Sequence, residues 1–297
     1  MIWYTRRMNI ELFTPYPKQK EFIDGFLASD KMFAVAVSPR GAGKSLMAMN
    51  LALYWALGEK NTKVAWVAPV YNQNRNIFDQ IVEAARELIT SSNKMEMIIN
   101  FINGSSIKLL SADAPDTIRG FRFNYVIIDE AAFVKQLTID QAILPTLNPN
   151  GKKCLLISTP KSRNHFYNWY MKPEVFSMRF KLEDCPYINR EVIDIAKKSL
   201  PHDIYLQEYE AQFVDSSNDV FQKINEVAYV GEYRKGGDVY VGVDTGLSND
   251  ASVLTCISPI GRVMNMVTLR NTDINSVATR FKEELQGYNV VGGYIEI

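Results

Sequence analysis

The segment that most constrains the fold runs from Met32 to Leu57. The apolar, β-branched stretch MFAVAV leads into the loop SPRGAGKS, and the apolar stretch LMAMNLALYWAL follows this loop. A buried strand, a glycine-bearing turn and a helix in this order are typical of a phosphate-binding loop. A chance glycine turn before a helix is the alternative. The buried strand before the turn and the largely apolar helix after it argue against that alternative.

The residue types within this loop suit a phosphate ligand. Gly41 and Gly43 allow a tight turn in which backbone N–H groups point inward. Lys44 reaches the β- and γ-phosphates of a nucleotide, and the Ser45 hydroxyl is a Mg²⁺ ligand. The loop departs from the usual G-x-x-x-x-G-K-[ST] pattern because Ser38 replaces the first glycine. The residues expected to bind nucleotide here are Ser38, Pro39, Arg40, Gly41, Ala42, Gly43, Lys44 and Ser45.

Composition narrows the class of protein. The 297 residues carry 33 basic and 33 acidic side chains, so balanced charge argues against a uniformly basic surface but allows a local basic groove. Three scattered cysteines give no disulfide framework, and two histidines argue against a zinc site. No apolar run reaches the ~18 residues of a membrane span, and the first residues lack a signal-peptide pattern. We expect a cytoplasmic protein without a membrane partner.

Acidic and hydroxyl side chains follow two further buried strands. The stretch YVIIDE ends in Asp129 and Glu130, and the stretch KCLLIS is followed by Thr159 after its last residue, Ser158. Because ligands bind at the carboxyl ends of parallel strands, we expect Asp129 to hold Mg²⁺ and Glu130 to orient an attacking water. Ser158 and Thr159 are expected to sense the γ-phosphate, with a hydrogen-bonded turn as the alternative. An apolar strand ending in Asp-Glu occurs often by chance. The YVIIDE stretch therefore indicates a nucleotide site only because it follows a phosphate-binding loop.

Strand-helix alternation through this region predicts a parallel, doubly wound α/β sheet. Gln19 precedes the first strand, and its amide can pair with a donor and an acceptor on an adenine edge; a solvent-facing helical glutamine is an equal alternative. Farther along, two helical segments flank Pro201. Tyr205, Tyr209 and Phe213 lie at i, i+4 and i+8, which predicts one helical stripe that faces the core.

A second pattern begins at residue 238. The strand VYVGVD ends in Asp244, and a strand hairpin, an amphipathic helix and a last strand with Glu296 follow. Three strands, a helix and a strand, with acids on the first and fourth strands, predict the opening half of a ribonuclease-H-like fold. Asp244 and Glu296 are then expected to share divalent metal, with Asp250 as an additional candidate ligand. The alternative is that these are surface acids at strand ends.

Together these motifs resemble the large terminase subunit of tailed bacteriophages, the ATP-driven DNA-packaging motor and nuclease. The stretches that carry the resemblance are YPKQ, SPRGAGKS, NGSSIKLLSA, DTIRGFRFNYVIIDEAA, LLISTP, YLQEYEAQF and VYVGVDTGLSND. The resemblance implies a RecA-like P-loop ATPase domain at residues 1–213, a linker at 214–237 and a partial RNase-H-like nuclease domain at 238–297. Terminases tolerate a non-glycine first position, so Ser38 fits the family.

The resemblance also assigns roles. It implies that Gln19 lies near adenine, that Lys44 binds phosphate and that Ser45 and Asp129 hold Mg²⁺. It makes Glu130 the catalytic glutamate and the Ser158–Thr159 pair the coupling motif. Two arginines resemble those that the family places near ATP: Arg40 inside the loop, and Arg119, which is expected to act in trans on a neighbouring subunit.

Partners follow from the same resemblance. They are double-stranded DNA, the portal protein, the small terminase subunit and further copies of the chain in a ring that assembles from monomers. The expected cofactors are ATP with Mg²⁺, and Mg²⁺ or Mn²⁺ at the nuclease site. The expected location is the host cytoplasm, at the procapsid and not in the mature virion. The family's nuclease uses a third acid late in its second domain, whereas the given sequence stops at Ile297. We therefore expect weak ATP hydrolysis and little or no DNA cleavage.

Three other functions compete with this interpretation. A DEAD-like helicase or translocase without nuclease chemistry needs a second motor domain, and the pattern after Val239 does not resemble one. A non-catalytic nucleotide-binding scaffold does not account for Glu130. A stand-alone RNase-H-type nuclease leaves the first two-thirds of the chain unexplained.

Overall fold

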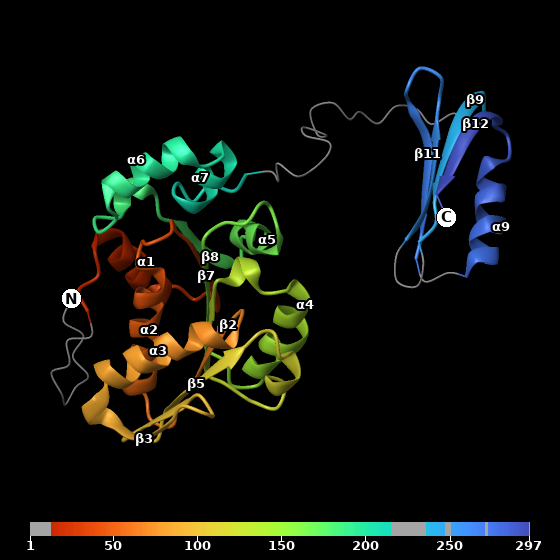
Figure 1. Ribbon diagram of the computed structural model, residues 1–297. Helices are drawn as coiled ribbons and strands as arrows, with labels where there is room; N and C mark the ends of the chain where they lie inside the picture. Colours follow the sequence, from red (N-terminus) through yellow and green to blue (C-terminus); the bar gives the residue numbers. More distant parts are fainter. Residues whose placement is uncertain (1–12, 215–235, 247–250, 271–272, 297) are drawn as a thin grey trace. The chain divides into compact units, whose positions relative to one another are not determined.

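The computed structural model describes residues 13–214, 236–246, 251–270 and 273–296 (Figure 1). Contacts between residues divide the chain into two compact units, Met1–Gln222 and Lys223–Ile297. The division falls within the segment predicted to be a linker. None of the helices in the described residues has the length and apolar character needed to cross a bilayer.

The first unit is built on an eight-stranded sheet with the order β3-β4-β5-β2-β6-β7-β1-β8. The strands from β5 to β8 in this order run parallel, whereas β3, β4 and β5 pair antiparallel. The predicted α/β fold with a mainly parallel sheet is thus confirmed. The strands are β1 (Phe33–Val37), β2 (Lys63–Ala68), β3 (Ile89–Asn93), β4 (Ile98–Phe101), β5 (Ser106–Ser111), β6 (Tyr125–Asp129), β7 (Lys153–Ser158) and β8 (Val175–Arg179).

Helices cover both faces of this sheet, which explains why its central strands are apolar throughout (Figure 1). Alternate residues of β1 belong to different cores: Ala34 and Ala36 pack with α1, α2 and α3, whereas Val35 and Val37 pack toward α5. The helices are α1 (Pro17–Ala28), α2 (Lys44–Gly58), α3 (Tyr71–Ala84), α4 (Gln136–Thr138), α5 (His165–Met171), α6 (Arg190–Ser199) and α7 (His202–Glu208). Shorter helical turns are η1 (Arg86–Leu88), η2 (Pro115–Thr117), η3 (Ala131–Phe133), η4 (Ile139–Ile143), η5 (Leu144–Leu147) and η6 (Leu182–Asp184).

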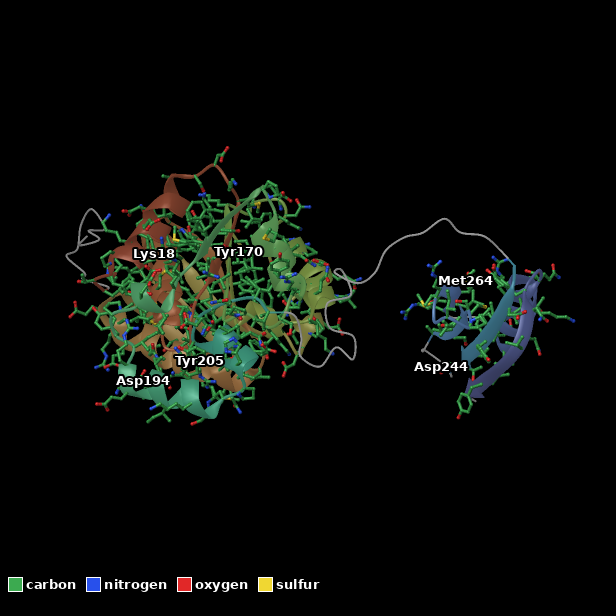
Figure 2. All side chains as sticks on the ribbon, turned by 90° about the horizontal axis from the view of Figure 1, so that it is seen from above. Lys18, Tyr170, Asp194, Tyr205, Asp244 and Met264 are labelled. Carbon is green, nitrogen blue, oxygen red and sulfur yellow. The ribbon has the colours of Figure 1, made fainter. Side chains whose placement is uncertain are left out.

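The predicted helical stripe of aromatic residues is wrong. Helix α7 ends at Glu208, and Ala211 has a left-handed backbone with φ 50°, so the chain turns away before Phe213. Tyr205 packs in the small core between α6 and α7 (Figure 2), whereas Phe213 contacts Phe166 of α5 with ring centroids 6.1 Å apart. The aromatic residues therefore belong to two cores rather than to one helix face.

The second unit contains a four-stranded sheet with the order β11-β10-β9-β12. The first and fourth strands of this unit, β9 and β12, lie side by side and run parallel. Helix α9 packs Val277 and Phe281 against the strands, with Val239 and Leu254 in the same core. The elements are β9 (Asp238–Asp244), β10 (Ser252–Ile257), β11 (Val263–Leu269), α9 (Ile274–Leu285) and β12 (Asn289–Glu296). The ribonuclease-H-like classification of this unit stays a prediction.

Candidate nucleotide-binding and catalytic site

The phosphate-binding loop joins the carboxyl end of β1 to the start of α2. Gly41 and Gly43 both adopt left-handed conformations, with φ 78° and 74°, which an L side chain adopts only with strain. Helix α2 begins at Lys44, directly after Gly43. Ser38 has no such left-handed backbone, and its N–H donates to the Ser158 carbonyl at 3.1 Å, which continues the β1–β7 pairing. A serine therefore fits where the usual pattern has glycine.

The catalytic candidate Glu130 is held between the loop lysine and the tip of β7. Lys44 Nζ lies 2.8 Å from Glu130 Oε1, and the Ser158 hydroxyl donates to Glu130 Oε2 at 3.2 Å. Glu130 itself has a left-handed backbone with φ 48°, a conformation that costs on the order of 1–3 kcal/mol in a non-glycine residue. Three strand ends, those of β1, β6 and β7, thus bring a cation, a carboxylate and a hydroxyl together.

Asp129, the last residue of β6, is 7% exposed. The Ser45 hydroxyl donates to its carboxylate at 3.0 Å, and the Glu130 N–H donates to it at 2.9 Å. Burial, with the charge of Glu130 second, raises the pKa of Asp129 to about 6. A carboxylate and a hydroxyl at this separation fit Mg²⁺, and a cation between them would offset both effects that raise the pKa.

The start of α1 holds the same loop from the other side. Gln19 is buried, and its Nε2 donates to the carbonyls of Ala42 and Gly43 at 3.4 and 3.3 Å. The Tyr16 hydroxyl also donates to the Ala42 carbonyl, at 3.0 Å. Sequence reasoning missed Tyr16, although it opens the YPKQ stretch. Gln19 is therefore next to the loop, and its role at adenine stays a prediction.

The two candidate arginines have different surroundings. The Arg40 N–H donates to the Glu208 carbonyl at 2.7 Å, and Arg40 Nη1 lies 3.7 Å from the Glu208 carboxylate. Arg119 lies in the segment between β5 and β6, where its exposed side chain pairs with Asp116 at 3.6 Å. Arg40 thus connects the phosphate-binding loop to the end of α7, whereas Arg119 pairs with a residue of its own segment.

Helix α7 touches both loops that border the site. Glu208 contacts Arg40 in the phosphate-binding loop, and the neighbouring Gln207 accepts a hydrogen bond from the Ser162 N–H in the loop after β7. These contacts place Gln207 and Glu208 of the YLQEYEAQF stretch beside the site, whereas the sequence predicted only a stripe facing the core for this stretch. Ser158 and Thr159 are both buried, and Ser158 is the register partner of Val37 at the end of β1.

The acids of the second unit form no metal cluster in the described residues. Asp244 and Glu296 are register partners on β9 and β12, so their backbones lie side by side. Asp250 and the Glu296 side chain lie outside the described part of the chain. Within that part, no three acidic, histidine or cysteine side chains converge to bind a metal ion. The nuclease site stays a prediction.

The sequence profile described as "Terminase large subunit, T4likevirus-type, N-terminal" matches residues 35–227. The chain belongs to this terminase large-subunit family. The terminase large subunit of Escherichia phage T5 is 28% identical over 262 residues, which cover 82% of this chain and 60% of that protein. That of Thermus virus P23-45 is 26% identical, over 75% and 56% of the two chains. This terminase chain thus spans 60% or less of the length of these curated relatives.

Solved structures agree with the fold. The large terminase ATPase domain of Thermus phage P74-26 has a TM-score of 0.61 and 25% identity, over 69% of this chain and 97% of that one. The large terminase of a thermophilic bacteriophage in complex with ADP has a TM-score of 0.59 at 14% identity, over 94% and 77% of the two chains, and supports the fold alone. The predicted P-loop NTPase fold of the first unit is confirmed.

Proposed function

We propose that this terminase chain is an ATP-hydrolysing motor that moves double-stranded DNA into a procapsid. The observation that carries the proposal is the convergence of Lys44, Ser45, Asp129 and Glu130 at the carboxyl edge of the sheet. Family membership and the likeness to a terminase ATPase domain support the same function.

Hydrolysis follows from the groups around Glu130. Lys44 exchanges the Glu130 carboxylate for the β- and γ-phosphates, which leaves one Glu130 oxygen available to orient water for in-line attack. The Ser158 hydroxyl holds the other oxygen during this exchange. Ser45 and Asp129 hold Mg²⁺, which neutralises phosphate charge when it is bound. Arg40 reaches the γ-phosphate once its weak pairing with Glu208 is released.

Force generation requires the site to communicate with the rest of the machine. Ser158 and Thr159 couple the γ-phosphate to the loop after β7, which contacts Gln207 of α7. In the assembled ring, Arg119 exchanges Asp116 for ATP on a neighbouring copy. The portal protein and the small terminase subunit are the other proposed partners, and the host cytoplasm is the proposed location. Asp244, Asp250 and Glu296 are proposed to bind Mg²⁺ or Mn²⁺ in the nuclease part.

Steady-state ATP hydrolysis with Mg²⁺ tests the motor. Glu130→Gln is expected to lower kcat by on the order of 10³-fold, as expected for loss of a general base. Mixing Glu130→Gln chains with Arg119→Ala chains is expected to restore part of the activity, because an interface in which a Glu130→Gln chain supplies Arg119 to the site of an Arg119→Ala chain has both groups intact. Unchanged turnover in Glu130→Gln would overturn the assigned mechanism. No recovery at any mixing ratio would overturn action in trans.

A further inference from the structure

The first residue of the phosphate-binding loop carries a hydroxyl group that has no hydrogen-bond partner. Ser38 is fully buried, and its Oγ makes no hydrogen bond with any residue of the described ranges. A buried hydroxyl that lacks a partner costs free energy, so a functional role for it is expected. The usual pattern has glycine at this position. The serine therefore adds a buried polar group to the site, and phosphate binding by Lys44 and backbone N–H groups makes no use of it.

Thr159 carries a second unpaired hydroxyl at the end of the neighbouring strand. It follows Ser158, the last residue of β7, and is 4% exposed. Its side chain forms no hydrogen bond within the part of the chain that the structure describes. The Ser158 hydroxyl, by contrast, donates to Glu130. Of the hydroxyls at these two strand ends, only the one that holds the catalytic candidate is already paired.

The backbone places the two unpaired hydroxyl residues side by side. The Ser38 N–H donates at 3.1 Å to the carbonyl of Ser158, the residue before Thr159. Ala36 and Ile157 both pack in the core that contains α1 and α2. Because side chains alternate between the faces of a sheet, Ser38 and Thr159, two residues farther along each strand, belong to that same face. Neighbouring strands lie ~4.8 Å apart, a separation that a hydrogen bond between two hydroxyl side chains can span.

A γ-phosphate would give this pair of hydroxyls a direction. Thr159 is one of the two residues proposed to contact the γ-phosphate, whose oxygens only accept hydrogen bonds. A hydroxyl can donate its proton and accept another at the same time. When Thr159 donates to the phosphate, its oxygen is available to the Ser38 hydroxyl, and both groups gain a partner. Each bond then strengthens the other, because hydrogen bonds in a chain polarise one another.

We therefore propose that Ser38 is a positioning residue for the γ-phosphate: its hydroxyl donates to Thr159, and Thr159 donates to the phosphate of bound ATP. This inference rests on the proposed function and deepens it, because it assigns part of the preference for ATP over ADP to two hydroxyls. ADP lacks the final acceptor of the chain. Ser38 is accordingly expected to contribute to ATP affinity and not to ADP affinity.

Calorimetry of the full chain with two nucleotides tests this inference. The Kd of Mg²⁺-adenylyl imidodiphosphate, a non-hydrolysable ATP analogue, is compared with the Kd of Mg²⁺-ADP. Ser38→Ala is expected to raise the Kd of the analogue about 2–10-fold, the contribution of one hydrogen bond, and to leave the Kd of ADP within ~2-fold. Ser38→Thr keeps the hydroxyl and is expected to keep the wild-type ratio of the two Kd values.

Ser177 of β8 supplies the matched control. Its Oγ is also buried and has no partner among the described residues, but it lies within a strand and not at the loop. Removal of either hydroxyl eliminates a desolvation cost, so Ser38→Ala and Ser177→Ala are both expected to keep or raise Tm, by up to ~4 °C. Only Ser38→Ala is expected to change the ratio of the Kd values. Equal losses of affinity for ADP and for the analogue in Ser38→Ala would indicate a general change in the loop and would overturn the inference.

A double variant tests whether Ser38 acts through Thr159. Once Thr159→Val has removed the intermediate hydroxyl, adding Ser38→Ala is expected to cause no further change in the ratio. Should Ser38→Ala fail to fold, Ser38→Gly, which restores the usual pattern, is expected to give the same result.

The outcomes separate this inference from the proposed function. Additive losses in the double variant, or a wild-type ratio in Ser38→Ala, would overturn the role of Ser38 while leaving ATP hydrolysis as proposed. The expected ratios in a chain that turns over no ATP would keep the hydroxyl pair and overturn the motor. A chain that binds neither nucleotide would overturn both.

Discussion

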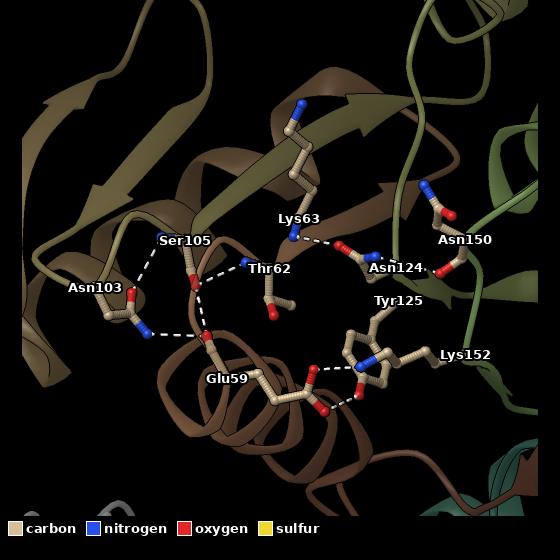
Figure 3. A network of polar contacts seen from close by, with 9 residues as sticks. All are labelled: Glu59, Thr62, Lys63, Asn103, Ser105, Asn124, Tyr125, Asn150 and Lys152. Carbon is tan, nitrogen blue, oxygen red and sulfur yellow. Dashed lines mark hydrogen bonds and ion pairs between the residues drawn. The ribbon is translucent and has the colours of Figure 1, made fainter.

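At the amino-terminal edge of the large sheet, polar groups form hydrogen bonds and an ion pair with one another. At the carboxyl edge, two neighbouring carboxylates, Asp129 and Glu130, lie beside a single lysine, Lys44. Figure 3 shows the first of these regions around the end of α2. The Ser105 hydroxyl accepts from the Thr62 N–H at 2.9 Å and donates to the Glu59 carbonyl at 2.8 Å. The Glu59 carboxylate accepts from the Tyr125 hydroxyl at 3.0 Å and pairs with Lys152.

Asparagine side chains extend this amino-edge network. Asn103 Nδ2 donates to the carbonyls of Ala56 and Glu59, at 2.8 and 3.0 Å, and so caps the end of α2. The Asn124 carboxamide accepts from the Lys63 N–H at 2.9 Å (Figure 3). These bonds join the first residues of neighbouring strands and the last residues of α2 without any ligand.

Two acids show how the edges differ. The hydrogen bond from Lys152 lowers the pKa of Glu59, so its charged form is favoured. Burial and the neighbouring Glu130 raise the pKa of Asp129, so its charged form is disfavoured. The charged Glu59 at the amino edge thus contributes to stability. The Asp129 carboxylate at the carboxyl edge is destabilised by its surroundings, and a bound cation would stabilise its charged form.

The largest expected effect on nucleotide affinity comes from the loop lysine. Lys44→Met removes the cation that faces Glu130 and, in the proposed function, the phosphates. The Kd for Mg²⁺-ATP, measured by calorimetry, is expected to rise about 10–100-fold, because a hydrogen bond to a charged group contributes about 1.5–3 kcal/mol. Lys152→Met at the amino edge is the matched control and is expected to leave the Kd unchanged. Equal effects of the two substitutions would erase the distinction between the edges.

Ser105→Ala is expected to have the largest effect on stability alone. Ser105 is buried, and its loss leaves the Thr62 N–H without its hydroxyl acceptor. An unsatisfied buried donor costs about 1–3 kcal/mol, so Tm in thermal denaturation is expected to fall by about 2–12 °C. ATP turnover at 25 °C is expected to stay at the wild-type level. A fall in turnover without a fall in Tm would contradict the claim that Ser105 acts on stability and not on catalysis.

Asp129→Asn is expected to stabilise the nucleotide-free protein while abolishing Mg²⁺-dependent turnover. Because the folded-state pKa of Asp129 is about 6, above its ordinary value, the native state binds more protons between about pH 4 and 6. The stability that the protonated Asp129 gives the native state is therefore present at low pH and is lost as the pH rises through about 6. At pH 7.5, Tm is expected to rise by about 2–4 °C, or about 1 kcal/mol. Glu59→Gln has the opposite sign, because its lowered pKa contributes stability that is lost as pH falls.

The smallest expected effect comes from Tyr125→Phe. It removes one hydroxyl that donates to Glu59 but keeps the ring stacked on Trp55, with centroids 4.6 Å apart. A single hydrogen bond contributes about 0.5–1.5 kcal/mol, so Tm is expected to fall by about 1–6 °C. A larger fall would mean that the Glu59 network is more cooperative than its separate bonds indicate.

The sequence predicted the carboxyl edge better than the amino edge, for a physical reason. The loop from Ser38 to Ser45 and the Asp129–Glu130 pair are short, local patterns whose residue types suit one ligand. The amino-edge network joins residues far apart in the chain, such as Ser105 and Glu59. The NGSS stretch was visible as part of a resemblance, but its capping of α2 required the fold.

Nonlocal contacts also account for what was missed at the site itself. Tyr16 and Gln207 reach their partners through tertiary packing, which no spacing in the sequence encodes. The left-handed backbone of Glu130 and the early end of α7 are likewise set by what surrounds them. The roles of Gln19, Arg119 and the acids of the second unit stay predictions.

One crossed measurement tests the central claim most directly: ATP turnover and Tm for Glu130→Gln and Glu59→Gln in parallel. The first is expected to lose turnover by on the order of 10³-fold and keep its Tm within ~2 °C. The second is expected to keep its turnover and lose Tm. A Glu130→Gln protein that hydrolyses ATP at the wild-type rate, or a Glu59→Gln protein that folds as well but hydrolyses none, would contradict the assignment of chemistry to one edge and stability to the other.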